Sequence, residues 1–176
     1  MKKFTADFET AVWLEAESFV WAWACCEIGN EENITIENDI SSFMKFLEKN
    51  SGSTFYFHNL KFDGEFIISE LLNSGFTFVK DRKEARDKTF QCIISDLGAF
   101  YEIIVYKEVK SKKVKKITFI DSLKIINQTV ESMPKTFKIP ENKLEIDYNE
   151  PRELGHILTK EENDYIKNDV KIVALA

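Results

Sequence analysis

Apolar residues recur with two different periods along this chain, and the order of those periods constrains its fold most strongly. Seven β-rich runs bounded by polar turns are expected strands: 5–9, 20–28, 34–36, 54–58, 90–95, 99–106 and 114–121. Segments with helical spacing lie between these runs and after them. Because strands stand before and after helices, we expect an α/β fold in which helices flank a central mixed β-sheet.

Three helices are expected from their caps and apolar faces. Asn38 or Asp39 can cap a helix of about three turns that packs on the sheet. Apolar residues at helical spacing define a second helix at about 63–73. Thr159 and Glu162 have the spacing of a capping box, which predicts a helix from there to the last residue.

The segment 123–148 has a weaker pattern. Pro134 and Pro140 limit any helix there to one or two turns near residues 132–137. The last helix reaches the chain end without a C-cap, so we expect residues 1–176 to be a single domain of a longer polypeptide.

Composition and charge exclude several classes of protein. The chain has 176 residues, 44% hydrophobic and 31% charged, without an apolar run long enough for a secretory signal or a bilayer. We therefore expect an intracellular protein with no membrane partner. Three cysteines without a CxxC pair predict reduced thiols, with no structural disulfide and no zinc. The net charge of −6 argues against a broad basic face for nucleic acid.

Two acidic residues on the first expected strand indicate a metal site. Asp7 and Glu9 are two residues apart, so their side chains project from the same face of the strand. Such a pair on an exposed strand is commonly just solvated. Here Phe4 and Phe8 flank the pair and favour a central strand, where two like charges are costly unless cations offset them.

Three further residues extend this constellation. Asp63 lies where a strand gives way to a helix, and a role as a helix N-cap explains it equally well. Tyr165 and Asp169 are four apart on the last helix, which stacks them on one face. They form either a solvated surface pair or the border of a cleft beside the buried stripe of Ile166 and Val170.

Together these carboxylates suit a pair of hard cations. Oxygen ligands from Asp7, Glu9, Asp63 and Asp169 favour Mg²⁺ or Mn²⁺. Two such ions about 4 Å apart can activate a water and stabilise the leaving oxygen of a phosphodiester. The hydroxyl of Tyr165 can then orient the water.

Three blocks resemble the DEDDy 3′→5′ exonucleases, specifically the proofreading domain of protein-primed family B DNA polymerases of bacteriophages and linear plasmids. The blocks occur in order as Asp7-Phe8-Glu9-Thr10, Tyr56-Phe57-His58-Asn59-Leu60-Lys61-Phe62-Asp63-Gly64 and Tyr165-Ile166-Lys167-Asn168-Asp169. Asp121-Ser122-Leu123-Lys124 and Ile146-Asp147-Tyr148 are also similar to the family, so the resemblance covers nearly the whole chain. It does not extend to polymerase palm, fingers or thumb.

The resemblance implies a ribonuclease H-like fold and a set of roles. Asp7, Glu9, Asp63 and Asp169 would bind two divalent cations, Mg²⁺ or Mn²⁺, while Tyr165 orients the attacking water and Lys143 assists at the scissile phosphate. The residues implied to bind the 3′ end of single-stranded DNA are Thr10, Tyr56, His58, Asn59, Phe62, Phe66, Ser122 and Leu123. Of these, Phe66 also lies on the apolar face of its helix, where a core role is the commoner one.

The same resemblance implies partners and a cellular context. The chain would be the N-terminal part of a longer DNA polymerase, working with the polymerase domains of that polypeptide and a terminal (priming) protein. Its location would be the cytoplasm of a bacterium that hosts a phage or mobile element. A lysine-rich turn at 107–116 could guide a DNA strand, although a solvated hairpin tip accounts for it more simply.

The expected activity is metal-dependent removal of nucleotides from the 3′ end of single-stranded DNA, in proofreading. Two alternatives remain open from the residues. The first is a DEDD-type exoribonuclease, because the chemistry is shared and the sequence has no certain sensor for a 2′-hydroxyl. The second is a catalytically silent module that binds single-stranded DNA or docks a polymerase.

Overall fold

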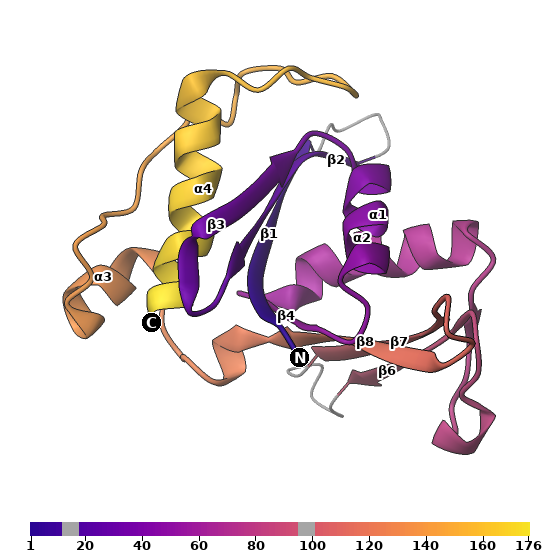
Figure 1. The fold of residues 1–176 in the computed structure, drawn as a ribbon. Helices are drawn as coiled ribbons and strands as arrows, with labels where there is room; N and C mark the ends of the chain where they lie inside the picture. Colours follow the sequence, from indigo (N-terminus) through magenta and orange to yellow (C-terminus); the bar gives the residue numbers. More distant parts are fainter. Residues whose placement is uncertain (12–17, 95–100) are drawn as a thin grey trace.

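The computed structural model describes residues 1–11, 18–94 and 101–176, and these form a mixed sheet with helices on both faces (Figure 1). The strands are β1 (Lys3–Ala11), β2 (Phe19–Glu27), β3 (Asn30–Glu37), β4 (Thr54–Phe57), β5 (Thr77–Phe78), β6 (Thr89–Ile94), β7 (Tyr101–Glu108) and β8 (Val114–Asp121). Their order in the sheet is β3-β2-β1-β4-β8-β7-β6-β5. β1, β4 and β8 run parallel, whereas β1–β2–β3 and β6–β7–β8 pair antiparallel.

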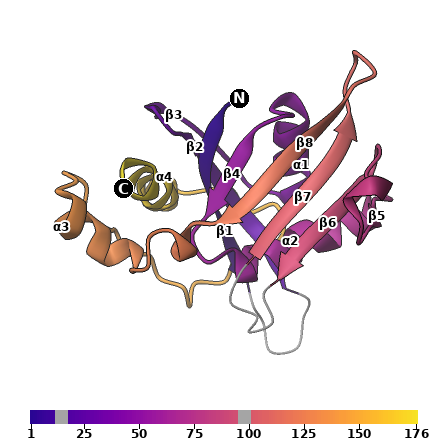
Figure 2. The same cartoon turned by 90° about the horizontal axis from the view of Figure 1, so that it is seen from below.

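Four α-helices and three short 3₁₀ helices complete the described fold. They are α1 (Ile40–Lys49), α2 (Leu60–Asn73), η1 (Arg82–Glu84), η2 (Ser122–Lys124), η3 (Val130–Ser132), α3 (Met133–Phe137) and α4 (Lys160–Leu175). Helices α1 and α2 lie on one side of the sheet and α4 lies on the other (Figures 1 and 2). No helix in the described ranges has the length and apolar content needed to cross a bilayer.

Alternation along β1 assigns its side chains to the two layers. Phe4, Ala6 and Phe8 join the larger core, which the sheet forms with α1 and α2. The intervening side chains face α4, and the buried Thr5 hydroxyl donates a 2.7 Å hydrogen bond to the Val170 carbonyl oxygen. The acidic residues of β1 are therefore directed to the layer that contains α4.

The parallel strands bring separate segments to one edge of the sheet. Ala6 is in register with Phe57, and Phe57 is in register with Asp121. The chain leaves the sheet after Phe57 and after Asp121, whereas β1 continues past Ala6 as far as Ala11 in pairing with β2. A crevice at this edge is where open α/β sheets usually bind ligands.

A smaller apolar core fixes α4. Ile166 and Val170 pack with Trp21, Ala22 and Ala24 of β2 in this cluster. The small alanine side chains allow the helix to lie close to the strand. The predicted capping box is confirmed, because the Thr159 hydroxyl accepts from the Glu162 amide while the Glu162 carboxylate accepts from the Thr159 amide.

Most expected elements are confirmed, with two differences among the described residues. Asp63 is not an N-cap: α2 already begins at Leu60, and Asn59 occupies the cap position in the left-handed region with φ of 78°. The short elements β5, η1, η2 and η3 were not predicted, because they are too short to show a period. Residues 95, 99 and 100 of two expected strands lie outside the described residues.

The thiols and the lysine-rich turn match their simplest interpretation. Cys25, Cys26 and Cys92 are free, and burial raises the pKa of each thiol. The turn at 107–116 joins β7 to β8, and its lysines from 110 to 116 are exposed. Lys107 instead reaches Glu48 of α1 at 2.7 Å.

Phe43 of α1 lies at the centre of the larger core and is fully buried. Its ring contacts aromatic rings from four strands: Phe8, Trp23, Phe55, Phe57 and Phe119. Aromatic pairs of this kind stabilise a core beyond the area that they bury.

We predict that Phe43→Ala lowers the free energy of unfolding by about 3–5 kcal/mol, because it leaves a cavity among these rings. Urea denaturation followed by tryptophan fluorescence measures the change. Ile157→Ala is the control: this side chain is 85% exposed, so its loss should change stability by no more than about 0.5 kcal/mol. Equal losses in both variants would contradict the assignment of the core.

Candidate active site

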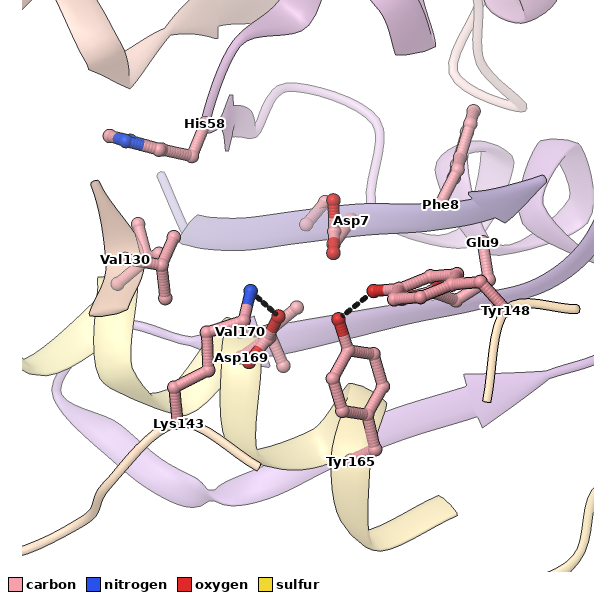
Figure 3. Close-up of a pocket in the computed structure, with 12 residues that line it drawn as sticks. Asp7, Phe8, Glu9, His58, Val130, Lys143, Tyr148, Tyr165, Asp169 and Val170 are labelled. Carbon is pink, nitrogen blue, oxygen red and sulfur yellow. Dashed lines mark hydrogen bonds and ion pairs between the residues drawn. The ribbon is translucent and has the colours of Figure 1, made fainter. Parts of the chain in front are cut away.

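A cavity of about 240 Å³ lies beside residues 6–9 of β1, next to the carboxyl end of β4 (Figure 3). Six residues singled out from the sequence line it: Asp7, Glu9, His58, Lys143, Tyr165 and Asp169. They come from β1, from the residue after β4, from the segment between α3 and α4, and from α4 itself. Tyr165 and Asp169 therefore border a cleft, as the second of the two sequence interpretations held.

The carboxylates of β1 are buried close to other negative charges. Burial and then the charge of Asp169 raise the pKa of Asp7 to about 7, although Lys143 acts in the opposite direction. Burial and then the charges of Asp7 and Asp169 raise the pKa of Glu9 to about 9. Both shifts mean that the ionised forms are disfavoured in this arrangement, first by burial and then by mutual repulsion.

Asp63 belongs to the same electrostatic cluster but not to the cavity lining. It is buried in the first turn of α2. Burial and then the charge of Asp7 raise its pKa well above the usual range. Its own charge in turn contributes to the raised pKa of Glu9.

Lys143 and Asp169 form an ion pair across the cavity. The Lys143 ammonium donates to Asp169 Oδ2 at 3.0 Å and lies 5.7 Å from the centre of the Tyr165 ring. Burial lowers the pKa of Lys143, but the bond to Asp169 and the charges of Asp169, Tyr148 and Asp7 together outweigh burial, so the net shift is upward. The other oxygen, Asp169 Oδ1, is buried and has no hydrogen-bond partner among the described residues.

A second tyrosine, which the sequence analysis assigned no role, completes the cavity. The hydroxyls of Tyr148 and Tyr165 are hydrogen-bonded to each other, and the Asp7 side chain points from β1 toward this pair and the Lys143–Asp169 pair (Figure 3). Burial and then the charge of Glu9 raise the pKa of Tyr165, so its hydroxyl stays protonated. The only sequence signal for Tyr148 was its place in the block Ile146-Asp147-Tyr148, which is similar to the family. The loop that carries Tyr148 has no hydrophobic periodicity that could have predicted its position.

His58 directly follows the last residue of β4, and two contacts hold its ring in one orientation. Its Nε2 donates to the Gln128 carbonyl oxygen at 2.8 Å, and its Nδ1 lies 3.1 Å from the Ser122 hydroxyl. Burial lowers the pKa of His58, which favours the neutral ring. Ser122 is itself buried and also lies 3.2 Å from the Phe57 carbonyl oxygen.

The remaining residues expected to bind DNA lie outside the lining of this cavity: Thr10, Tyr56, Asn59, Phe62, Phe66, Ser122 and Leu123. Phe62 is 65% exposed at the start of α2 and is free to meet a ligand. Phe66 packs partly against the larger core, in agreement with the core alternative. The backbone amide of Asn59 donates to Asp121 Oδ1 at 3.0 Å, which connects the start of α2 to the end of β8.

The donor set fits hard divalent cations, although no ready-made coordination shell is present. Within the described ranges, no three His, Cys, Asp or Glu side chains surround one point as metal ligands. The carboxylates nevertheless supply only oxygen donors, and Asp169 Oδ1 is buried without a partner in that part of the chain. Cations are what would offset the mutual repulsion of these groups.

A family model described as DNA polymerase type B, organellar and viral, matches residues 44–175. This chain belongs to the type B DNA polymerases. It is 40% identical to the DNA polymerase of Bacillus phage B103 and 37% identical to that of Bacillus phage phi29, over 99% of this chain and 30% of each relative. The chain thus spans less than a third of the length of these relatives.

Solved structures of phi29 DNA polymerase are also similar to the chain. The orthorhombic crystal form superposes with a TM-score of 0.90 at 35% identity, covering 99% of this chain and 30% of that chain. The complex with single-stranded DNA gives a TM-score of 0.89 with the same coverage. The α/β class and the ribonuclease H-like fold expected for this type B polymerase chain are confirmed.

The carboxylate cluster predicts an unusual pH dependence for the metal-free protein. The pKa of Glu9 rises from an ordinary 4.5 to about 9 on folding, so the folded state binds more protons than the unfolded state between these values. Stability should therefore fall as pH rises through this window, by roughly 1 kcal/mol per pH unit. Thermal unfolding in chelator from pH 5 to 9 measures the slope.

Glu9→Gln removes one titrating group and should flatten this slope, leaving the variant more stable than the parent at pH 8. Glu37→Gln on β3, an exposed carboxylate, is the control and should keep the parental slope. A parental slope in Glu9→Gln would show that repulsion at Glu9 does not limit stability.

Proposed function

We propose that this chain is the two-metal 3′→5′ exodeoxyribonuclease that proofreads for a type B DNA polymerase. The observation that carries the proposal is the cavity at the sheet edge, where buried carboxylates with raised pKa values meet the protonated hydroxyl of Tyr165. Groups that repel each other this strongly are kept together where a function requires them.

Asp7, Glu9, Asp63 and Asp169 would hold two divalent cations, Mg²⁺ or Mn²⁺. When bound, such ions activate a water and stabilise the leaving oxygen of the phosphodiester. Asp63 reaches the cluster from the first turn of α2, where the helix dipole favours an anionic side chain.

Two further residues act directly on the reacting groups. The Tyr165 hydroxyl is protonated and held by Tyr148, so it can orient the attacking water. The raised pKa keeps Lys143 positively charged, and its ammonium can contact the scissile phosphate. These roles need geometry rather than proton abstraction by a strong base.

The DNA end would be bound without readout of its sequence. Phe62 is exposed in the first turn of α2 and can stack on an unpaired base, while Tyr56 and Leu123 are partly exposed on β4 and η2. Thr10, His58, Asn59 and Ser122 supply hydrogen-bonding groups for phosphate and sugar. A phi29 DNA polymerase structure is complexed with single-stranded DNA, which supports this choice of ligand.

The chain would work inside a longer polymerase. Its relatives are DNA polymerases of which it covers 30%. The proposed partners are accordingly the polymerase domains of the same polypeptide and a terminal protein, in the cytoplasm of a bacterial host.

We expect the purified chain to degrade a 3′-labelled DNA single strand with Mg²⁺ or Mn²⁺, and not with chelator. Asp7→Ala combined with Glu9→Ala should slow degradation by at least about a thousandfold, because both residues hold the ions. Gel analysis should show loss of single nucleotides from the 3′ end. Glu37→Gln, on an exposed strand, should degrade DNA at the parental rate.

The alternatives give different outcomes in the same assay. Equal or faster degradation of a matched RNA strand would support an exoribonuclease. DNA binding without degradation, together with no heat on calorimetric titration with Mn²⁺, would support the catalytically silent module. Full activity in the double variant would overturn the assignment of the site.

A further inference from the structure

The segment that carries Tyr148 into the cavity has no regular structure, yet a buried arginine holds it. Arg152 is 4% exposed although it lies in this loop. Its Nη1 donates to the carbonyl oxygens of Asp147 at 2.8 Å and Glu150 at 3.1 Å. These two carbonyls bracket Tyr148, so one guanidinium nitrogen closes the turn that presents this tyrosine.

The same guanidinium connects the turn to α4. Arg152 Nε donates to Glu162 Oε1 at 2.7 Å, and both side chains are 4% exposed. Glu162 precedes Tyr165 by three positions on α4, so the two side chains lie on one face of the helix. A single contact therefore links the turn bearing Tyr148 to the helix bearing Tyr165.

Further contacts make the link rigid. The other oxygen, Glu162 Oε2, accepts from the Thr159 amide at 2.9 Å and lies 2.7 Å from His156 Nε2. Burial raises the pKa of Glu162, but bonds from Thr159, Arg152 and His156 outweigh burial and lower it to about 2. Arg152 also stacks on Trp21 of β2, 4.6 Å from the ring centre.

We propose that Arg152, acting through Glu162, is a positioning residue that fixes the Tyr148 hydroxyl against the Tyr165 hydroxyl. This rests on the proposed function, in which Tyr165 orients the attacking water. Neither Arg152 nor Glu162 lines the cavity, so neither touches the reacting groups. The planar guanidinium of arginine is required here. It donates to two backbone carbonyls and to the Glu162 carboxylate, and it also stacks on the Trp21 indole.

The test is a double-mutant cycle on kcat for single-stranded DNA. Arg152→Lys keeps the charge but loses the fork, and it should lower kcat by about tenfold to a hundredfold. Tyr148→Phe removes the positioned hydroxyl and should lower kcat by a similar factor. In the double variant the second change should add nothing to the loss of kcat.

Glu150→Gln is the matched control, because its exposed carboxylate lies 3.7 Å from Arg152 Nη2 while its carbonyl is unchanged. It should retain the parental kcat. If Arg152→Lys melts below the assay temperature, Glu162→Gln replaces it in the cycle. Multiplicative losses, a full kcat in Arg152→Lys, or a full kcat in Tyr148→Phe would each overturn the proposal.

A readout without activity separates this inference from the proposed function. In metal-free protein with ¹³C-labelled tyrosine rings, Arg152→Lys should shift the resonances of Tyr148 and Tyr165, and Glu150→Gln should not. Unshifted resonances in Arg152→Lys would overturn the positioning role. If the parent chain fails to degrade DNA but Arg152→Lys still shifts these resonances, the exonuclease proposal is refuted and the structural link is retained.

Discussion

The crowding of buried carboxylates at one edge of the sheet is the constraint on which the rest of the site depends. Burial raises the pKa of Asp7, Glu9 and Asp169, neighbouring carboxylates raise it further for Asp7 and Glu9, and Lys143 offsets only part of these effects. Such a cluster is unfavourable for folding unless other contacts hold it in place. The two apolar cores supply those contacts, because they fix β1 from one side and α4 from the other.

The two tyrosines show how the site depends on an irregular segment. Tyr165 is set by a helix with a complete capping box, whereas Tyr148 lies in a loop between α3 and α4. This loop lacks the backbone hydrogen bonds that would hold a strand in a sheet. The buried ion pair between Arg152 and Glu162 holds it instead. Polar networks of this kind define geometry when every member is satisfied.

Periodicity was sufficient for the frame but not for the loops. Alternation in β1 predicted that Asp7 and Glu9 share a face, and the i, i+4 spacing of Tyr165 and Asp169 predicted a shared helix face, because backbone geometry alone decides both. Asp63 was ambiguous, since a strand end and a helix start have no period and the cap fell at Asn59 instead. Tyr148 and the Arg152–Glu162 link depend on long-range contacts that no local pattern records.

The hydrogen bond between Thr5 and Val170 joins residues 165 positions apart. During synthesis from the N-terminus, β1 is therefore made long before the helix that covers its acidic face. Until α4 emerges, Asp7 and Glu9 stay open to water and their mutual repulsion is screened. The cavity can close only as a late, non-local step, so this part of the molecule should be the last to reach its native order.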